Sequence, residues 1–176
     1  MGFSLLALLI GSRYHNSMKK AVSIICVGKV KTPHWQDAAK DYLQRLSRSW
    51  QIKLITVREA RDYSTEERNQ REGAYILEAL HDLDPSATLI IALDEGGELY
   101  TSAQFSERLR LCWEQENRVP CFIIGGAYGL CPEIRHKARH VLSLGPMTLP
   151  HELAQVLLLE QLYRADAILR GSPYHH

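Results

Sequence analysis

Three apolar runs of this 176-residue chain end in loops that could hold a ligand. Their sequences are TLIIALDEGG at 88–97, CFIIGGAYGL at 121–130 and SLGPMT at 143–148. Glycine in such a loop lets a ligand approach the backbone closely. In sheets of parallel strands, ligands bind outside the carboxyl ends of the strands. We therefore expect the strand exits near residues 93, 125 and 144 to converge on one binding site.

Strand and helix patterns alternate around these loops. Strands are expected at 21–28, 52–57, 89–93, 121–124 and 140–144, and helices at 34–48, 65–83, 101–117, 132–139 and 150–169. This alternation implies parallel strand pairings and an α/β sandwich. Thr65 is expected to cap the second helix, and Pro150 suits the first turn of the last one.

The last expected helix, at 150–169, carries apolar residues on more than one face. A surface helix needs a single apolar stripe facing the core. Two apolar faces indicate that the helix packs on its own sheet and on another surface, for which a second copy of the chain is the simplest candidate. We therefore expect a homodimer with Leu158 and Leu162 in the contact between copies.

Length and composition indicate one globular domain, because 45% of the residues are hydrophobic and 23% are charged. The net charge of +1 lacks the electrostatic footprint of a general nucleic-acid binder. The four cysteines form no CxxC pair and are expected to be buried free thiols in a reducing compartment. The eight histidines show no metal-binding spacing, so no metal is expected.

Residues 1–17 are treated apart from the domain at 18–176. Their apolar run, at 3–10, is too short to span a bilayer, and no positive charge precedes it as in a signal peptide. We interpret 1–17 as an extension that is disordered or lies upstream of the natural start, and we expect no membrane association.

Several motifs resemble one known family. IIGGAYGL, SLGPMTLPH, ELAQVLLLEQLYRA and a chain ending in PYHH are similar to the small SPOUT methyltransferases. More narrowly, they resemble the ribosomal RNA large subunit methyltransferase H family, as do CVGKVKTPHW and DYLQRL nearer the start. The likeness runs from about Met18 to His176, and the pairing of TLPH with LYRA at this spacing is its most specific part.

The resemblance implies a three-layer α/β/α sandwich with a mainly parallel sheet and a C-terminal trefoil knot, an exception to the rule against knots. It also implies a cytoplasmic homodimer with composite active sites that methylates N3 of a pseudouridine in 23S rRNA on the assembled ribosome. The cofactor would be S-adenosyl-L-methionine. Its contacts would be Leu93, Gly126, Leu144, Gly145, Pro146, Met147, Thr148 and Leu149.

The resemblance also suggests catalytic roles for three residues. The N3 imide proton must leave during methylation, and His175 in the terminal tail is the natural base. Tyr174 could stack on the target base. Arg164 could hold a phosphate or the tail, or simply pair with Asp166 or Glu160. His176 stands where relatives often carry Lys or Arg, and Tyr128 where some carry an acidic residue.

Other interpretations remain open at this point. A ribosome-binding factor could keep the fold without catalysis. A flavodoxin-like nucleotide-binding enzyme would need a glycine-rich turn after the first strand, and CVGKV at 26–30 matches this poorly. His151 is interpreted as a structural histidine with satisfied hydrogen bonds, and Asp94 and Glu95 suit a solvated turn as well as a ligand contact. Several cations would contribute to RNA binding only if they cluster near the pocket. They are Lys29, Lys31, Arg45, Arg48, Arg135, Lys137 and Arg139.

Overall fold

The computed structural model of the protein describes residues 20–61 and 64–172, so the expectations for 1–17, Tyr174 and His175 lie outside it. Five strands form one parallel sheet of order β2-β1-β4-β3-β5. The strands are β1 Lys20–Val27, β2 Trp50–Val57, β3 Thr88–Leu99, β4 Val119–Ile124 and β5 His140–Ser143. The helices are α1 Pro33–Leu46, α2 Thr65–His81, α3 Ser102–Glu114, α4 Pro132–Lys137 and α5 His151–Leu169.

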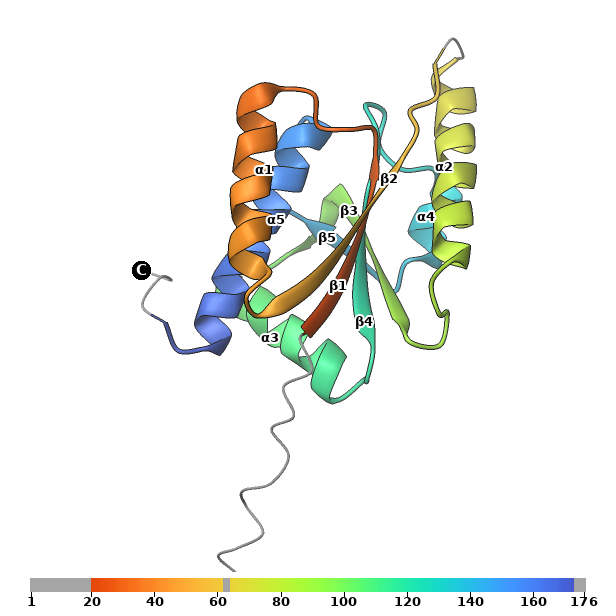
Figure 1. Cartoon of the computed structure of the whole chain (residues 1–176). Coiled ribbons are helices and arrows are strands. Elements are labelled where there is room, and N and C mark those ends of the chain that lie inside the picture. The colour runs from red at the N-terminus through yellow and green to blue at the C-terminus, as the bar shows by residue number, and fades with distance from the viewer. Residues whose placement is uncertain (1–19, 62–63, 173–176) are drawn as a thin grey trace, which may run out of the picture.

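Helices cover both faces of this sheet, which confirms the three-layer α/β/α prediction. Figure 1 shows α1, α3 and α5 on one side of the sheet and α2 and α4 on the other. Neighbouring residues of β1 point to opposite faces, so Ile24 lies in the core under α5 while Ile25 lies in the core under α2. Both faces of the central strands are therefore buried, which explains their continuous apolar runs. The trefoil knot remains a prediction.

Two helix starts differ from expectation. Ser64, not Thr65, caps α2, because its hydroxyl accepts from the Glu67 N–H while the Glu67 carboxylate accepts from the Ser64 N–H. Ser64 followed three residues later by Glu67 is a capping box, a stronger signal than a threonine alone. Pro150 precedes α5 as its N-cap residue and does not form part of the first turn.

The third strand continues beyond the predicted end at Leu93. Both Leu93 and Glu98 pair with Leu142 of β5, and the register is interrupted between them. The prediction of a loop exit at 93 was therefore incomplete, because the chain bulges over 94–97 and then resumes as a strand. The bulge keeps Asp94 and Glu95 at the carboxyl end of the sheet. A straight strand would have carried the two residues beyond that end.

The last helix does not need a second copy to cover both of its apolar faces. It packs on the sheet and also lies between α1 and α3 of its own chain. Leu158 and Leu162 are fully buried in this core, so the expectation that they contact another copy was wrong. Among the half-buried apolar residues of α5, those that do not pack against this core are Leu153, Leu157 and Ile168.

All four cysteines are buried and free, as the sequence predicted. Burial raises the pKa of both the Cys26 and the Cys121 thiols to about 12, so neither is a ready nucleophile at neutral pH. Within residues 20–61 and 64–172, no helix is long and apolar enough to cross a bilayer. The same residues contain no cluster of three or more metal-binding side chains.

A buried carboxylate fastens the end of α5 to the start of β2. Asp166, 3% exposed, accepts hydrogen bonds from Trp50 Nε1 at 2.7 Å and Ser49 Oγ at 2.9 Å. Its charge is balanced by Arg170, whose Nε lies 2.9 Å away. The pairing of Arg164 with Asp166 that the sequence allowed is therefore replaced by one with Arg170.

Replacing Asp166 with alanine should lower the free energy of unfolding by about 2–4 kcal/mol, because the buried indole N–H of Trp50 loses its acceptor. Asp37→Ala is the matched control, since that side chain is 80% exposed and 4.0 Å from Lys40. It should cost less than about 0.5 kcal/mol. Urea denaturation of both variants gives the two values, and equal losses would contradict the role of Asp166.

Candidate functional site

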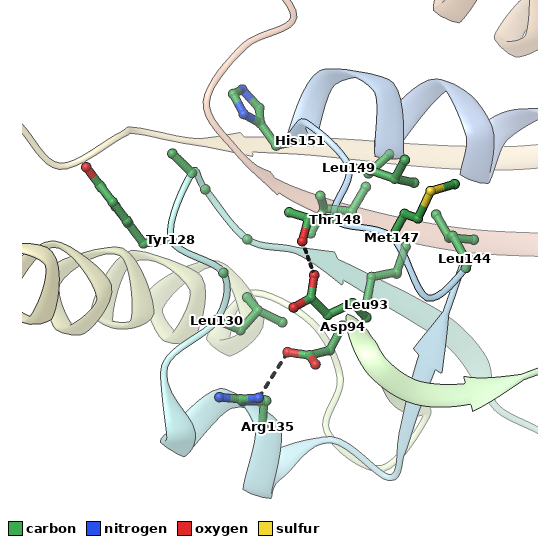
Figure 2. Close-up of a pocket in the computed structure, with 18 residues that line it drawn as sticks. Leu93, Asp94, Tyr128, Leu130, Arg135, Leu144, Met147, Thr148, Leu149 and His151 are labelled. Atoms are coloured by element: carbon green, nitrogen blue, oxygen red, sulfur yellow. Dashed lines mark hydrogen bonds and ion pairs between the residues drawn. The ribbon is translucent and has the colours of Figure 1, made fainter.

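A pocket of about 360 Å³ opens at the carboxyl ends of β3, β4 and β5. Its walls come from the bulge after Leu93, the glycine loop at 125–129, the turn at 144–149 and the first residues of α5. Figure 2 shows side chains from these separate segments gathered around the same space. The expected convergence of the three strand exits is therefore confirmed.

Seven of the eight residues predicted to contact a cofactor line this pocket, and Pro146 does not. Those seven are Leu93, Gly126, Leu144, Gly145, Met147, Thr148 and Leu149. Their apolar side chains and the backbone of the turn together form a small-molecule site of ordinary size, since such pockets measure about 300–1,000 Å³. The role of each residue in cofactor binding remains a prediction.

A buried serine holds the turn after β5 in shape. The Ser143 hydroxyl, on a residue only 4% exposed, accepts from the Gly145 N–H at 3.1 Å and lies 3.1 Å from the Glu95 carbonyl oxygen. Gly145 has a φ of 149°, and a Cβ there would meet no atom within 4 Å. The turn thus leaves open space beside its backbone. Sequence reasoning missed Ser143, although a serine before a Gly-Pro turn is a known local signal.

Two carboxylates, Asp94 and Glu95, border the pocket, and their contact with a ligand remains a prediction. Arg135 of α4 donates to Asp94 at 3.0 Å, and the Thr148 hydroxyl donates to Glu95 (Figure 2). Both acidic residues line the pocket. They connect the β3 bulge to α4 and to the turn after β5.

A further carboxylate, Glu72 of α2, supports the glycine loop from behind. It is 6% exposed, and its Oε1 accepts from the Ala60 N–H at 3.1 Å. A Cβ at Gly126 would lie only 2.6 Å from its Oε2, so a larger residue at that position would displace the carboxylate. Burial raises the pKa of Glu72 above its usual value. Sequence reasoning missed Glu72 because it stands in a charged helical segment that looks solvated.

His151 faces the same region from the start of α5. It lines the pocket, and its charge would lower the pKa of Glu72. Its buried Nε2 has no hydrogen-bond partner among the residues the structure describes. The interpretation of His151 as a structural histidine with satisfied hydrogen bonds was therefore wrong.

Arg164, a predicted catalytic residue, does not line this pocket in its own chain. Its guanidinium binds the Glu160 carboxylate on α5, with Nη2 at 2.7 Å and Nε at 3.0 Å. It follows His151 by thirteen residues, which corresponds to about 20 Å along a helix. Tyr174 and His175 lie outside the described residues, so the structure places neither of them.

The fold and the pocket define a SPOUT-class methyltransferase domain. The family model described as "Predicted SPOUT methyltransferase" matches residues 20–175. The fold of a probable methyltransferase from Bordetella pertussis is similar, with a TM-score of 0.50 at 15% identity over 84% of this chain and 94% of that one.

Two curated relatives narrow the identification. The ribosomal RNA large subunit methyltransferase H of Oleidesulfovibrio alaskensis is 51% identical over 158 residues, which cover 89% of this chain and 99% of the relative. The protein of the same name from Nitratidesulfovibrio vulgaris strain Miyazaki F is 48% identical with the same coverage. The chain thus belongs to the SPOUT methyltransferases, and within them to the ribosomal RNA large subunit methyltransferase H family.

The raised pKa of Glu72 generates a pH-dependent prediction. A carboxyl group whose pKa is raised by folding stabilises the folded state below its unfolded pKa, and this contribution is lost as the pH rises through the folded pKa. Glu72→Gln stays neutral and can still accept from Ala60. Its melting temperature relative to the unsubstituted chain should therefore increase from pH 4 to pH 8.

The control is Glu66→Gln, which changes an exposed glutamate in the first turn of the same helix. This carboxylate favours the positive helix start, so its loss should not stabilise the chain at pH 8. Thermal melts monitored by circular dichroism at several pH values provide the comparison. A difference for Glu72→Gln that does not grow with pH would contradict the buried carboxyl group.

Proposed function

We propose that this chain is an S-adenosyl-L-methionine-dependent enzyme that methylates N3 of a pseudouridine in 23S rRNA on the assembled ribosome. The observation that carries the proposal is the pocket formed by three strand exits. It occurs in a chain that shares 51% identity with nearly the full length of a protein named ribosomal RNA large subunit methyltransferase H. Such an enzyme works in the cytoplasm, where ribosomes are.

The residues of the pocket fit the proposed cofactor. Leu93, Leu144 and Leu149 offer apolar contacts for a planar base, and the open backbone at Gly145 lets a ligand approach closely. Glu95 offers a carboxylate oxygen suited to ribose hydroxyls. When bound, S-adenosyl-L-methionine supplies an activated methyl group, so the protein mainly has to bind, orient and accept a proton.

The proposed proton acceptor is His175 in the terminal tail. A histidine has a pKa near neutrality, so it can take the N3 imide proton as the methyl group is transferred. Tyr174 is proposed to stack on the target base, and Arg164 to hold a phosphate or the tail. The match of the family model up to residue 175 supports a function for the tail, because it includes Tyr174 and His175.

The distance of Arg164 from its own pocket supports a composite site in a homodimer. A two-fold contact through the half-buried face of α5, with Leu153 and Leu157, would allow one chain to present Arg164 and its tail to the partner's pocket. The non-catalytic alternative, a ribosome-binding factor, would need neither an open pocket nor a tail that reaches it.

The tail mechanism predicts a selective loss of catalysis. His175→Ala should slow methyl transfer about 100- to 10,000-fold, the range for a positioned acid or base. Deleting 173–176 should abolish it, while both changes leave cofactor affinity within a few fold. Ser172 is retained because its N–H bonds the Ala167 carbonyl at the end of α5.

The assay measures tritiated methyl transfer to ribosomes that lack the modification, with mass spectrometry to map the methylated nucleotide and calorimetry to measure cofactor binding. His176→Ala is the matched control and should have a smaller effect. Full activity of the shortened chain would refute the tail mechanism. Cofactor binding without any transfer by the unsubstituted chain would favour the ribosome-binding factor.

The dimer proposal predicts different outcomes at two adjacent leucines. Leu157→Glu should give a folded monomer, because Leu157 is half-buried in the single chain and lies on the proposed contact face. Leu158→Glu should prevent folding, because Leu158 is fully buried in the core of its own chain. Light scattering and circular dichroism distinguish the results. A Leu157→Glu variant that remains dimeric would show that copies associate elsewhere.

A further inference from the structure

A second depression, also of about 360 Å³, lies at the carboxyl ends of β1 and β2, on the same edge of the sheet as the pocket. Its cationic residues, which we name the basic rim, are Lys29, Lys31, Arg58 and Arg61. All four are exposed. Two of them, Arg58 and Arg61, come from a loop that showed no distinctive signal in the sequence beyond its polarity.

The basic rim concentrates positive charge on a nearly neutral chain. Among the described residues that line the depression, Glu59 is the one carboxylate, and it lies 2.9 Å from Lys31 Nζ and 3.3 Å from Arg61 Nη2. The hydrogen bond from Lys31 lowers the pKa of Glu59, so this residue is ionised at neutral pH. Four cations and Glu59 leave three positive charges among the described residues that line the depression, whereas the whole chain has a net charge of +1.

The basic rim is held in place by groups that also support the pocket. Glu72 accepts from the Ala60 N–H with one oxygen and lies against Gly126 with the other. Glu152, the residue after His151, accepts from the backbone N–H groups of Lys31 and Thr32, each at 3.1 Å. The loops that carry the cations are therefore fixed relative to the glycine loop and to the start of α5.

The arginines are presented in a way that suits phosphate. The Arg58 guanidinium lies 4.1 Å from the centre of the Tyr75 ring, which orients its plane and leaves N–H groups at its edge. Arg68, one turn before Glu72 on α2, lies 5.5 Å from the ring of Tyr128 at the pocket. Cations thus continue from the basic rim towards the pocket, where an aromatic ring is available for a base to stack on.

We propose that the basic rim binds the phosphodiester backbone of the rRNA next to the target nucleotide, and so positions that nucleotide over the pocket. This inference rests on the proposed function. A membrane surface fits less well, because none of the exposed large apolar side chains in the described residues belongs to the basic rim. A backbone contact requires only charge and spacing, which is what these four side chains provide.

The test removes two cations that the proposed catalytic machinery does not use, in the variant Lys29→Gln/Arg61→Gln. Its matched control, Arg118→Gln/Arg139→Gln, removes the same charge at the opposite edge, before β4 and β5. In the methyl-transfer assay, the rim variant should raise the KM for ribosomes about tenfold or more, with kcat and cofactor affinity unchanged. The slope of log affinity against log salt should become shallower by about 1.4–1.8, the value for two phosphate contacts.

Unchanged KM and salt slope in the rim variant, or equal effects in the control, would overturn the proposal. Sedimentation with ribosomes measures the same salt dependence without catalysis. If the unsubstituted chain transferred no methyl group, the proposed function would fail. Loss of ribosome binding in the rim variant, but not in the control variant, would still support RNA binding by the basic rim. Loss of binding to phosphatidylserine vesicles with ribosome binding intact would identify a membrane contact instead and would also overturn the proposal.

Discussion

The parallel direction of the described strands is the constraint on which the rest of this structure depends. Because the strands all run the same way, their carboxyl ends meet at one edge, and every loop with functional potential begins there. The pocket takes its walls from the exits of β3, β4 and β5, and the basic rim takes its cations from the exits of β1 and β2. One sheet edge thereby combines the pocket with the basic rim.

Carboxylates in this chain act mainly as structural clamps between segments that are distant in sequence. Asp166 connects α5 to β2, Glu152 connects α5 to the loop after β1, and Glu72 connects α2 to the loop after β2. Each accepts hydrogen bonds from the segment that it holds, and these bonds offset the cost of desolvating the carboxylate. Such clamps give the loops around the pocket fixed positions, which methyl transfer requires because it depends on orientation.

Much of the fold could be predicted from local patterns. Alternating apolar and amphipathic segments identified all ten described elements, with boundaries shifted by a few residues. The errors arose where a longer-range interaction competed with a local signal. The β3 bulge depends on pairing with β5, and the second apolar face of α5 is covered by α1 and α3. A local sequence pattern does not predict which elements become neighbours.

The sequence by itself determined the class of fold, the three loops of the pocket and the family, because short motifs and hydrophobic periodicity are enough to identify them. Only the tertiary structure decided which polar residues lie beside those loops. Glu72 and Arg58 look like ordinary surface charges in the sequence, yet one is buried behind Gly126 and the other is fixed on Tyr75. The physical reason is that burial and charge clustering arise from packing between distant segments, whereas periodicity reports only which face of each element is apolar.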